Sequence, residues 1–244
     1  MKKIDAIIEA RMNSSRLPGK VMFKIKNKPI LELLVDRLRS VSDLKKIVIA
    51  TTTNPVDDQI VSWAKKKKVL FFRGSENDVM ERVLKTAKRF KIDNILNITG
   101  DCPLIDPQLV SQFIKIYKKN ECEYLNNCKY RSYPVGMDIQ IYPTKILKKS
   151  FSQTKELRHR EHVTLHILEN EKVFNHLNII APPEIYFPNL GLTLDEPLDF
   201  KLIKKIFLHF FSRRNEFTCL DIINFLNKNK KLLLINNKVK RKKK

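Results

Sequence analysis

Several motifs that commonly mark a function are missing from this 244-residue chain. Its four cysteines form no CxxC pair and no zinc-binding spacing, so we expect reduced thiols. No apolar run approaches the roughly 20 residues needed to span a bilayer. The opening residues, MKKIDAIIEAR, lack the apolar core of a signal peptide because Asp5 and Glu9 interrupt it. These absences predict a globular protein that stays in the cytoplasm.

Acidic residues are also scarce. There are 26 of them against 48 lysines and arginines, which gives a formal net charge of +22. Such a charge favours nucleic acid or an anionic membrane as a partner. However, lysines outnumber arginines and scatter over the expected helix faces, and no RRM, KH, zinc-finger or helix-turn-helix pattern is present. We therefore expect no specific nucleic-acid partner.

The last residues, KVKRKKK, form a block of like charge. Such blocks are usually solvated and disordered. We expect residues 229–244 to be a basic, disordered tail that adds little to the core. Near an anionic membrane, each basic residue of the tail would contribute about 1 kcal/mol of attraction. A weak membrane contact through the tail is therefore expected.

Short apolar runs alternate with segments of helical periodicity. Strands are expected at 4–8, 47–51, 69–72, 94–98, 137–142, 173–180 and 190–194, and helices at 29–40, 55–66, 76–90 and 107–119. Asp106 before Pro107 is a typical helix start. The alternation predicts one α/β domain over residues 1–228, with a mostly parallel, Rossmann-like central sheet between two helix layers.

Polar segments follow four of the expected strands. They are residues 10–20, TTTNP at 51–55, RGSEND at 73–78 and TGDCPLID at 99–106. In a parallel sheet, ligands bind beyond the carboxyl ends of the strands. These segments are therefore expected to meet at one edge and form the active site.

The first polar segment carries three cations, Arg11, Arg16 and Lys20, with Ser14 and Ser15 between them. Cations, hydroxyls and backbone N–H groups together suit a polyphosphate. The segment has neither the P-loop pattern GxxxxGK[ST] nor GxGxxG. Taken alone, its spacing fits a solvated basic turn equally well.

Two carboxylates follow apolar runs, Asp101 in NITGDCPLIDP and Asp195 in GLTLDEPLDF. Oxygen ligands of this kind suit Mg²⁺ that also binds substrate phosphates. The alternative for Asp101 is an ordinary turn residue. For Asp195 it is a helix start, with Asp195 or Glu196 as the cap before Pro197.

Together these segments resemble the CMP-sugar synthetases, which include the acylneuraminate and 3-deoxy-manno-octulosonate cytidylyltransferases, and most closely the SpsF-type spore-coat branch. EARMNSSRLPGKVM resembles the family's phosphate loop, A-R-x-G-S-[ST]-R-L-P-G-K, and RGSENDVMERV its base- and ribose-side segment. TGDCPLID and LTLDEPLDF resemble its two metal motifs, and YPVGMDIQIY and REHVT also look like this branch. Asn13 stands where the family usually has Gly, and Asn tolerates a left-handed backbone. The resemblance runs in order from about residue 4 to about residue 205.

The resemblance implies a nucleotidyltransferase fold and the transfer of CMP from CTP to a nonulosonate- or octulosonate-like sugar acid, or a related acceptor. Pyrophosphate is released, and the product serves surface-polysaccharide synthesis. Relatives often form homodimers. By carry-over, the catalytic residues are Arg11, Lys20, Asp101 and Asp195, of which Asp101 and Asp195 hold Mg²⁺. The nucleotide-binding residues are Ala10, Arg11, Met12, Ser14, Arg16, Lys20, Gly74, Ser75, Asp78 and Arg82. The acceptor-binding residues are Tyr133, Asp138, Arg158, Arg160 and His162.

Other interpretations stay open. Tyr133 also fits the core, and His159, His162 and His166 share a helical face that would suit zinc, although HExxH is absent. One alternative function is a glycosyltransferase that uses a nucleotide sugar, but such enzymes usually carry D-x-D, which this chain lacks. Another is a non-catalytic protein that binds nucleotides or anionic surfaces. Pyrophosphate release from CTP separates all three.

Overall fold

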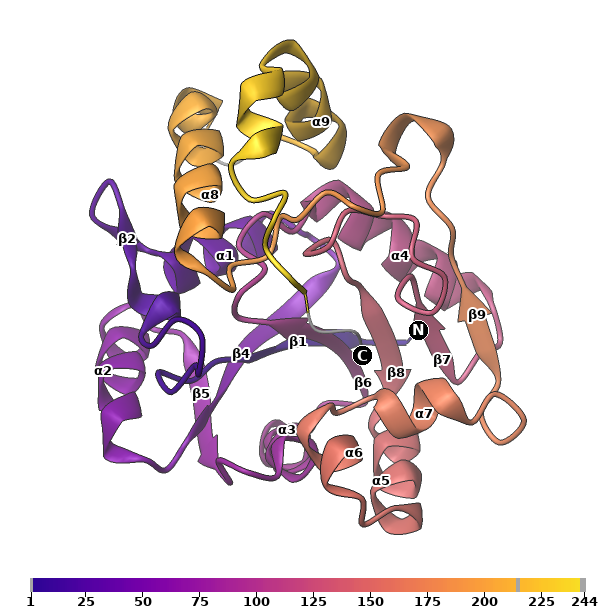
Figure 1. Ribbon diagram of the computed structural model, residues 1–244. Coiled ribbons are helices and arrows are strands. Elements are labelled where there is room, and N and C mark those ends of the chain that lie inside the picture. Colours follow the sequence, from indigo (N-terminus) through magenta and orange to yellow (C-terminus); the bar gives the residue numbers. More distant parts are fainter. Residues whose placement is uncertain (1, 214–215, 242–244) are drawn as a thin grey trace.

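A seven-stranded sheet lies at the centre of the computed structural model, which describes residues 2–213 and 216–241 (Figure 1). Its order is β5-β4-β1-β6-β8-β7-β9, and only β8 runs antiparallel to its neighbours. The predicted mostly parallel sheet is thereby confirmed. The bounds are β1 Ile4–Glu9, β4 Leu44–Thr52, β5 Leu70–Gly74, β6 Asn94–Thr99, β7 Tyr124–Asn126, β8 Gln140–Pro143 and β9 His176–Asn178.

Helices cover both faces of this sheet, as the three-layer prediction requires. One hydrophobic cluster joins one face to α1 Ile30–Arg39, α2 Asp58–Lys66, α4 Pro107–Lys119, α8 Pro197–His209 and α9 Cys219–Lys228. A second cluster joins the other face to α3 Val79–Phe90, α5 Thr144–Gln153 and α7 Leu165–Glu169. The short α6, Leu157–Glu161, lies on the side of α3 (Figure 1).

Local sequence explains the main elements. The run IDAIIE of β1 is buried almost throughout because β1 pairs on both sides and helices cover both faces. The carboxylate of Asp106 accepts hydrogen bonds from the backbone N–H groups of Gln108 (2.8 Å) and Leu109 (3.4 Å), and Pro107 is the first residue of α4. The predicted helix start at Asp106 is confirmed.

The chain reverses its direction across the sheet between β1 and β6. It passes from β1 to β4 and β5, and then α3 returns it to β6 on the other side of β1. Such a switch point opens a crevice beyond the strand ends. The two loops that border it approach closely, because the N–H of Gly100 donates to the carbonyl oxygen of Glu9 (2.8 Å). A Cβ at Gly100 would lie 2.8 Å from that oxygen, so this approach requires glycine.

Some shorter elements differ from the prediction. β8 and β9 are shorter than expected, and residues 190–194 form an irregular buried segment with only one bridge, from Gly191 to Val135. No pattern in the sequence predicted the three-residue β7. The hairpin of β2 (Lys24–Ile25) and β3 (Lys28–Pro29) was also missed; its turn residues Lys26 and Asn27 have positive φ, as a tight hairpin requires.

The C-terminal segment also differs from the expected disordered tail. Residues Lys230–Leu234 form a 3₁₀ helix and Asn236 is buried, whereas residues 242–244 lie outside the described part. In Figure 1 the chain after α9 descends toward the sheet. Among the residues that the structure describes, no helix is long and apolar enough to cross a bilayer.

Candidate active site

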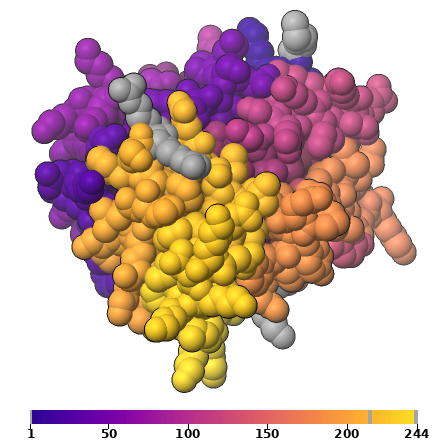
Figure 2. Space-filling model, turned by 90° about the horizontal axis from the view of Figure 1, so that it is seen from above, coloured from indigo at the N-terminus to yellow at the C-terminus, as the bar shows by residue number. Residues whose placement is uncertain are grey.

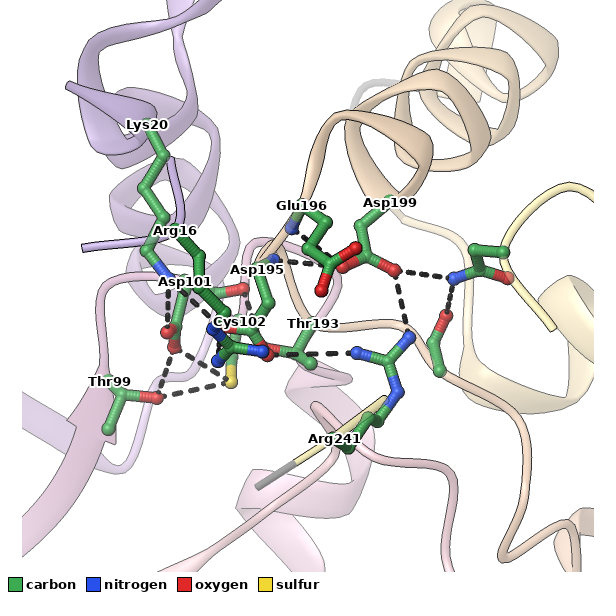
Figure 3. Close-up of polar contacts among 12 residues, drawn as sticks. Arg16, Lys20, Thr99, Asp101, Cys102, Thr193, Asp195, Glu196, Asp199 and Arg241 are labelled. Atoms are coloured by element: carbon green, nitrogen blue, oxygen red, sulfur yellow. Dashed lines mark hydrogen bonds and ion pairs between the residues drawn. The ribbon is translucent and has the colours of Figure 1, made fainter. Parts of the chain in front are cut away.

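Lys20 joins three distant segments of the sequence at the crevice between β1 and β6. It is the first residue of a short 3₁₀ helix, Lys20–Met22, and its side chain is largely buried. The ammonium Nζ lies 2.8 Å from Oδ2 of Asp101 and 3.1 Å from Oδ1 of Asp195 (Figure 3). Burial lowers the pKa of Lys20, but the two carboxylates outweigh burial and raise it above its ordinary value. Lys20 therefore stays charged and holds both carboxylates at one point.

Asp101 lies just beyond the end of β6 and is tied to the segment before Asp195. The hydroxyl of Thr99 donates to Oδ1 of Asp101 (2.6 Å). The carbonyl oxygen of Asp101 accepts from the N–H of Leu194 (2.8 Å) and the hydroxyl of Thr193 (3.3 Å). These bonds fix both carboxylate-bearing segments at the same edge of the sheet.

Asp195 is oriented from several directions. Arg16 Nη2 lies 2.8 Å from its Oδ1. Its backbone N–H, like that of Glu196, donates to Oδ2 of the fully buried Asp199 (3.0 Å each). Glu196 is the N-cap of α8, so the cap prediction holds for Glu196, and the Asp195 side chain is available to the site. Arg241, from the C-terminal segment, lies on the other side of Asp195 (Figure 3).

The donor set fits a divalent cation that is shared with a substrate. Asp101 and Asp195 converge on one ammonium, so their oxygens are close enough to share a ligand. Across residues 2–213 and 216–241, no group of three or more His, Cys, Asp or Glu side chains forms a cage for a metal. Mg²⁺ typically takes one or two carboxylates and completes its shell with water and phosphate oxygens. Two carboxylates beside a phosphate loop agree with this coordination of Mg²⁺.

The predicted phosphate loop is closed and anchored. The carbonyl oxygen of Met12 accepts from the N–H groups of Ser14 (2.9 Å) and Gly19 (2.8 Å). The N–H of Met12 donates to Oδ1 of Asp57 (2.6 Å), a buried carboxylate. Gly19 has a φ of 73°, whereas Asn13 does not adopt the left-handed backbone that Asn would tolerate. The loop needs its left-handed residue at Gly19, so Asn replaces Gly at position 13 without backbone strain.

The other predicted nucleotide-binding residues lie beside this loop. Arg11 Nη1 donates to the carbonyl oxygen of Glu76 (3.3 Å). The carboxylate of Glu76 accepts from Asn13 Nδ2 (3.0 Å) and Asn54 Nδ2 (2.9 Å), and these bonds lower the pKa of Glu76. Loop 10–20 and the segment after β5 therefore form one wall of the crevice.

Arg82 is buried at the base of this wall. Its Nη1 donates to the carbonyl oxygen of Ser75, whereas its buried Nε has no hydrogen-bond partner among the described residues. Burial lowers the pKa of Arg82. Gly74 ends β5, and Asp78 is the N-cap of α3, where its Oδ1 accepts from the N–H of Glu81 (2.7 Å). These residues position the wall, and their contact with a nucleotide stays a prediction.

Tyr133 and Asp138 both have partners within the protein. Tyr133 is buried, with its ring edge-on to Phe113, and burial raises its pKa to about 12. This position agrees with the alternative of core packing. Asp138 forms a two-pronged ion pair with Arg131. To contact the acceptor as predicted, Asp138 would have to bind it while paired with Arg131, and Tyr133 would have to bind it from its buried position.

The predicted acceptor residues on α6 also bind within the protein. Arg158 pairs with Glu156 (2.9 Å) and, through two nitrogens, with Glu169 (2.6 and 2.7 Å). Arg160 lies over the ring of Phe151 and pairs with Asp78 (3.3 Å). These arginines brace α6 in the structure, which the sequence did not indicate. The backbone N–H of His162 donates to the carbonyl oxygen of Arg158 at the end of α6 (2.9 Å).

Four residues of the site were not predicted: Asp57, Thr99, Asp199 and Arg241. Asp57 and Thr99 stand in or beside polar segments that follow strands, so their position was a usable signal. Asp199 belongs to the quoted LTLDEPLDF. Arg241 had no signal because it stands within a block of like charge.

Known proteins resemble this chain in sequence and in fold. Residues 6–231 match the profile of the family described as Cytidylyltransferase. The spore coat polysaccharide biosynthesis protein SpsF of Bacillus subtilis is 31% identical over 94% of this chain and 96% of its own. A 3-deoxy-manno-octulosonate cytidylyltransferase of Geobacter metallireducens is 30% identical over 46% of this chain and 43% of its own. A solved structure of a cytidylyltransferase from Leptospira borgpetersenii is 32% identical, with a TM-score of 0.91 and complete coverage of both chains.

Proposed function

The chain belongs to the cytidylyltransferase family, and from that membership we propose that it transfers CMP from CTP to a sugar acid or a related acceptor and releases pyrophosphate. Its enzyme class is that of the family, a CTP-dependent nucleotidyltransferase. The acceptor class follows the names of the relatives, one of which acts on 3-deoxy-manno-octulosonate and another in spore coat polysaccharide synthesis. We therefore place the reaction in the synthesis of surface-polysaccharide precursors, in the cytoplasm.

One observation carries this proposal: the Lys20 ammonium is shared between Asp101 (2.8 Å) and Asp195 (3.1 Å). The three residues come from three motifs that lie up to 175 positions apart in the sequence. Lys20 and the two carboxylates lie at the switch point of a parallel sheet, where ligands bind. Because the surrounding protein has a lower dielectric constant than water, electrostatic interactions with a charged ligand are stronger there.

The transfer itself needs no nucleophile from the protein. An acceptor oxygen bonds to the α-phosphorus of CTP while the bond from that phosphorus to the bridging oxygen of pyrophosphate breaks, and the acceptor proton leaves as H⁺. Arg11, Arg16 and Lys20 lie at the crevice, where they neutralise the triphosphate and the charge that develops on the leaving group. The backbone of loop 10–20 holds these cations in place before the substrate arrives.

Asp101 and Asp195 are the residues that would hold Mg²⁺. When bound, the ion would supply further positive charge against the phosphate oxygens. The protein's part is to hold both carboxylates close together. Lys20 and Arg16 do this in the structure.

Pyrophosphate release tests the proposal. The purified protein with Mg²⁺ is assayed with CTP, UTP, ATP or GTP against nonulosonic acids, octulosonic acids and phosphorylated acceptors. We expect release with CTP and at least one sugar acid, and loss of release in Lys20→Ala. Sugar transfer from a nucleotide sugar would instead favour a glycosyltransferase. Nucleotide binding without any pyrophosphate release would favour a non-catalytic binder.

A further inference from the structure

The C-terminal segment, residues 229–241, packs against the active site. Asn236, of which only 5% is exposed, anchors it. Asn236 Nδ2 donates to the carbonyl oxygen of Gly191 (2.9 Å) and to Oδ1 of Asp199 (2.7 Å). Figure 2 shows the C-terminal residues, in yellow, packed onto the face of the molecule that carries α8 and α9. Both Asn236 and Arg241 lie beyond the stretch that matches the family profile, which ends at residue 231.

Arg241 reaches the carboxylate that Asn236 binds, Asp199, and also that of Asp195. Its Nη2 lies 2.8 Å from Oδ1 of Asp199, and its Nη1 lies 3.7 Å from Oδ2 of Asp195 (Figure 3). Arg16 binds the other oxygen of Asp195, Oδ1, at 2.8 Å. Asp195 is thus flanked by one guanidinium from the phosphate loop and one from the C-terminal segment.

Gly191 provides the space for the Arg241 guanidinium. A Cβ at position 191 would lie 1.8 Å from Nη2 and 2.3 Å from Cζ of Arg241. The backbone of Gly191 does not lie in the left-handed region, so its conformation would accept another residue. A methyl group here would therefore displace the end of the Arg241 side chain with little strain elsewhere.

Asp199 connects the C-terminal segment to Asp195. It is fully buried. Its Oδ2 accepts the backbone N–H groups of Asp195 and Glu196, while its Oδ1 accepts from Asn236 and Arg241. A buried carboxylate that loses its charged partner is left with an uncompensated charge and moves or draws in water. The C-terminal segment therefore constrains the residue that holds the backbone of Asp195.

We propose that Arg241, seated over Gly191, is a positioning residue of the active site, which holds Asp195 in place both directly and through Asp199. The proposal rests on the function proposed above, because Asp195 is there a ligand of the divalent ion. It replaces, for Arg241, the expectation of a basic, disordered tail that adds little to the core. Only the other basic residues of the tail are left to a surface role.

The test uses the full-length protein and five variants, of which Arg241→Lys serves the rescue experiment described below. Arg241→Gln removes the guanidinium charge, Gly191→Ala displaces it, and the double variant does both. Lys240→Gln removes the same charge from the exposed neighbouring residue and is the control. Because partners behind a metal ligand typically contribute about 10- to 100-fold to metal affinity or rate, we expect that loss in kcat for Arg241→Gln and for Gly191→Ala. KM for CTP should stay within about twofold because the cations of loop 10–20 remain.

Two further readouts separate positioning from a purely structural role. Mn²⁺ binding in the presence of CTP, measured by electron paramagnetic resonance, needs no acceptor. It should weaken in Arg241→Gln and Gly191→Ala and be unchanged in Lys240→Gln, at a temperature at which all of these proteins are folded. The thermal midpoints of Arg241→Gln and Gly191→Ala should fall, because the buried Asp199 loses its charged partner. Arg241→Lys should recover part of the loss, because it keeps the charge without the planar fork. The double variant should lose no more than either single variant, because both remove one contact.

Three results would overturn the proposal. Wild-type kcat and Mn²⁺ affinity in Arg241→Gln would show that the contact does nothing. Higher kcat in that variant would show that the segment obstructs the site. Multiplying losses in the double variant would show that Gly191 acts without Arg241. If no acceptor is turned over but Mn²⁺ binding with CTP still falls in both single variants, the proposed function fails at its acceptor and the role of Arg241 stands.

Discussion

At the scale of single residues, buried charges organise this site. Lys20, Asp57 and Asp199 are each less than one-tenth exposed, yet each is surrounded by partners of opposite charge or by hydrogen-bond donors. Burying a charge is costly unless such partners are present. Each of the three charges therefore holds its partner segment in a fixed position. If that segment moved away, the buried charge would lose its partner, which is energetically costly.

Asp57 gives the first prediction. It accepts the N–H of Met12 from the phosphate loop, and the N–H of Thr52 (3.1 Å) and the hydroxyl of Thr51 (3.1 Å) from the end of β4. In Asp57→Asn an amide N–H₂ group faces one of these donors, so we expect KM for CTP to rise by at least about fivefold. The free energy of unfolding should fall by about 1–3 kcal/mol.

Steady-state kinetics and urea unfolding of one preparation measure both effects. Asp58→Asn is the matched control, since Asp58 is exposed and pairs only at the surface with Arg73. The importance of Asp57 for the loop would be contradicted by an unchanged KM together with normal unfolding.

At the scale of elements, the long periodic segments were predictable and the short ones were not. α4 has both a capping residue and a regular apolar face, and the structure gives it the predicted bounds, 107–119. β7 has three residues, which is too short to show a period, and the strand expected at 173–180 forms only over the three residues of β9. Residues 190–194 were expected to be a strand because they are apolar, but their buried leucines pack into the core without a continuous ladder. Hydrophobicity alone cannot distinguish the two cases.

Histidines between α5, α6 and α7 give a second prediction, which concerns pH. His166 accepts or donates a hydrogen bond with Ser150 (3.0 Å) and lies edge-on to His159, with Glu156 and Glu169 nearby. Burial, followed by the neighbouring His159, lowers the pKa of His166 below its ordinary 6.5. The unfolded chain therefore binds a proton there before the folded chain does. Stability must fall as pH drops through about 6.5.

Urea midpoints between about pH 7.5 and about pH 5.5 test this prediction. The wild-type midpoint should decrease on acidification, and the decrease should be smaller in His166→Asn, which cannot take up the proton. His176 provides a second contribution with the same sign, because burial lowers its pKa as well. Parallel curves for both proteins would exclude His166 as a source of the acid sensitivity.

At the scale of the whole molecule, the net charge of +22 favours the approach of anionic ligands, and a nucleoside triphosphate is one of them. The proposed function predicts that CTP with Mg²⁺ stabilises the protein more than ATP or GTP does. A ligand at about 100 times its Kd adds about 2.7 kcal/mol to stability. Thermal-shift titrations with each nucleotide measure this, and equal shifts for all of them would count against a cytidine-specific site.

The sequence predicted which residues come together at the candidate site better than it predicted the contacts around them. Arg16, Lys20, Asp101 and Asp195 do meet at one edge of the sheet, because the ends of parallel strands are brought together by the topology itself. By contrast, the ion pairs of Arg158 with Glu169 and of Asp138 with Arg131 depend on which side chains happen to face one another. The position of the Arg241 guanidinium depends on the space that Gly191 leaves, 50 positions earlier in the sequence, and no local sequence pattern indicates this contact.

The central claim is that Asp101 and Asp195 act as one unit around the metal and the α-phosphate. Pyrophosphate release by Asp101→Asn, Asp195→Asn and the double variant, with urea unfolding of each protein, tests it most directly. Each single variant should unfold near the wild-type midpoint and lose at least about 100-fold in turnover, the scale of one lost electrostatic contact. The double variant should lose much less than the product of the single losses, because groups that act together are not additive. Near wild-type turnover with lowered urea midpoints would instead show that both aspartates are structural residues and contradict the proposed mechanism.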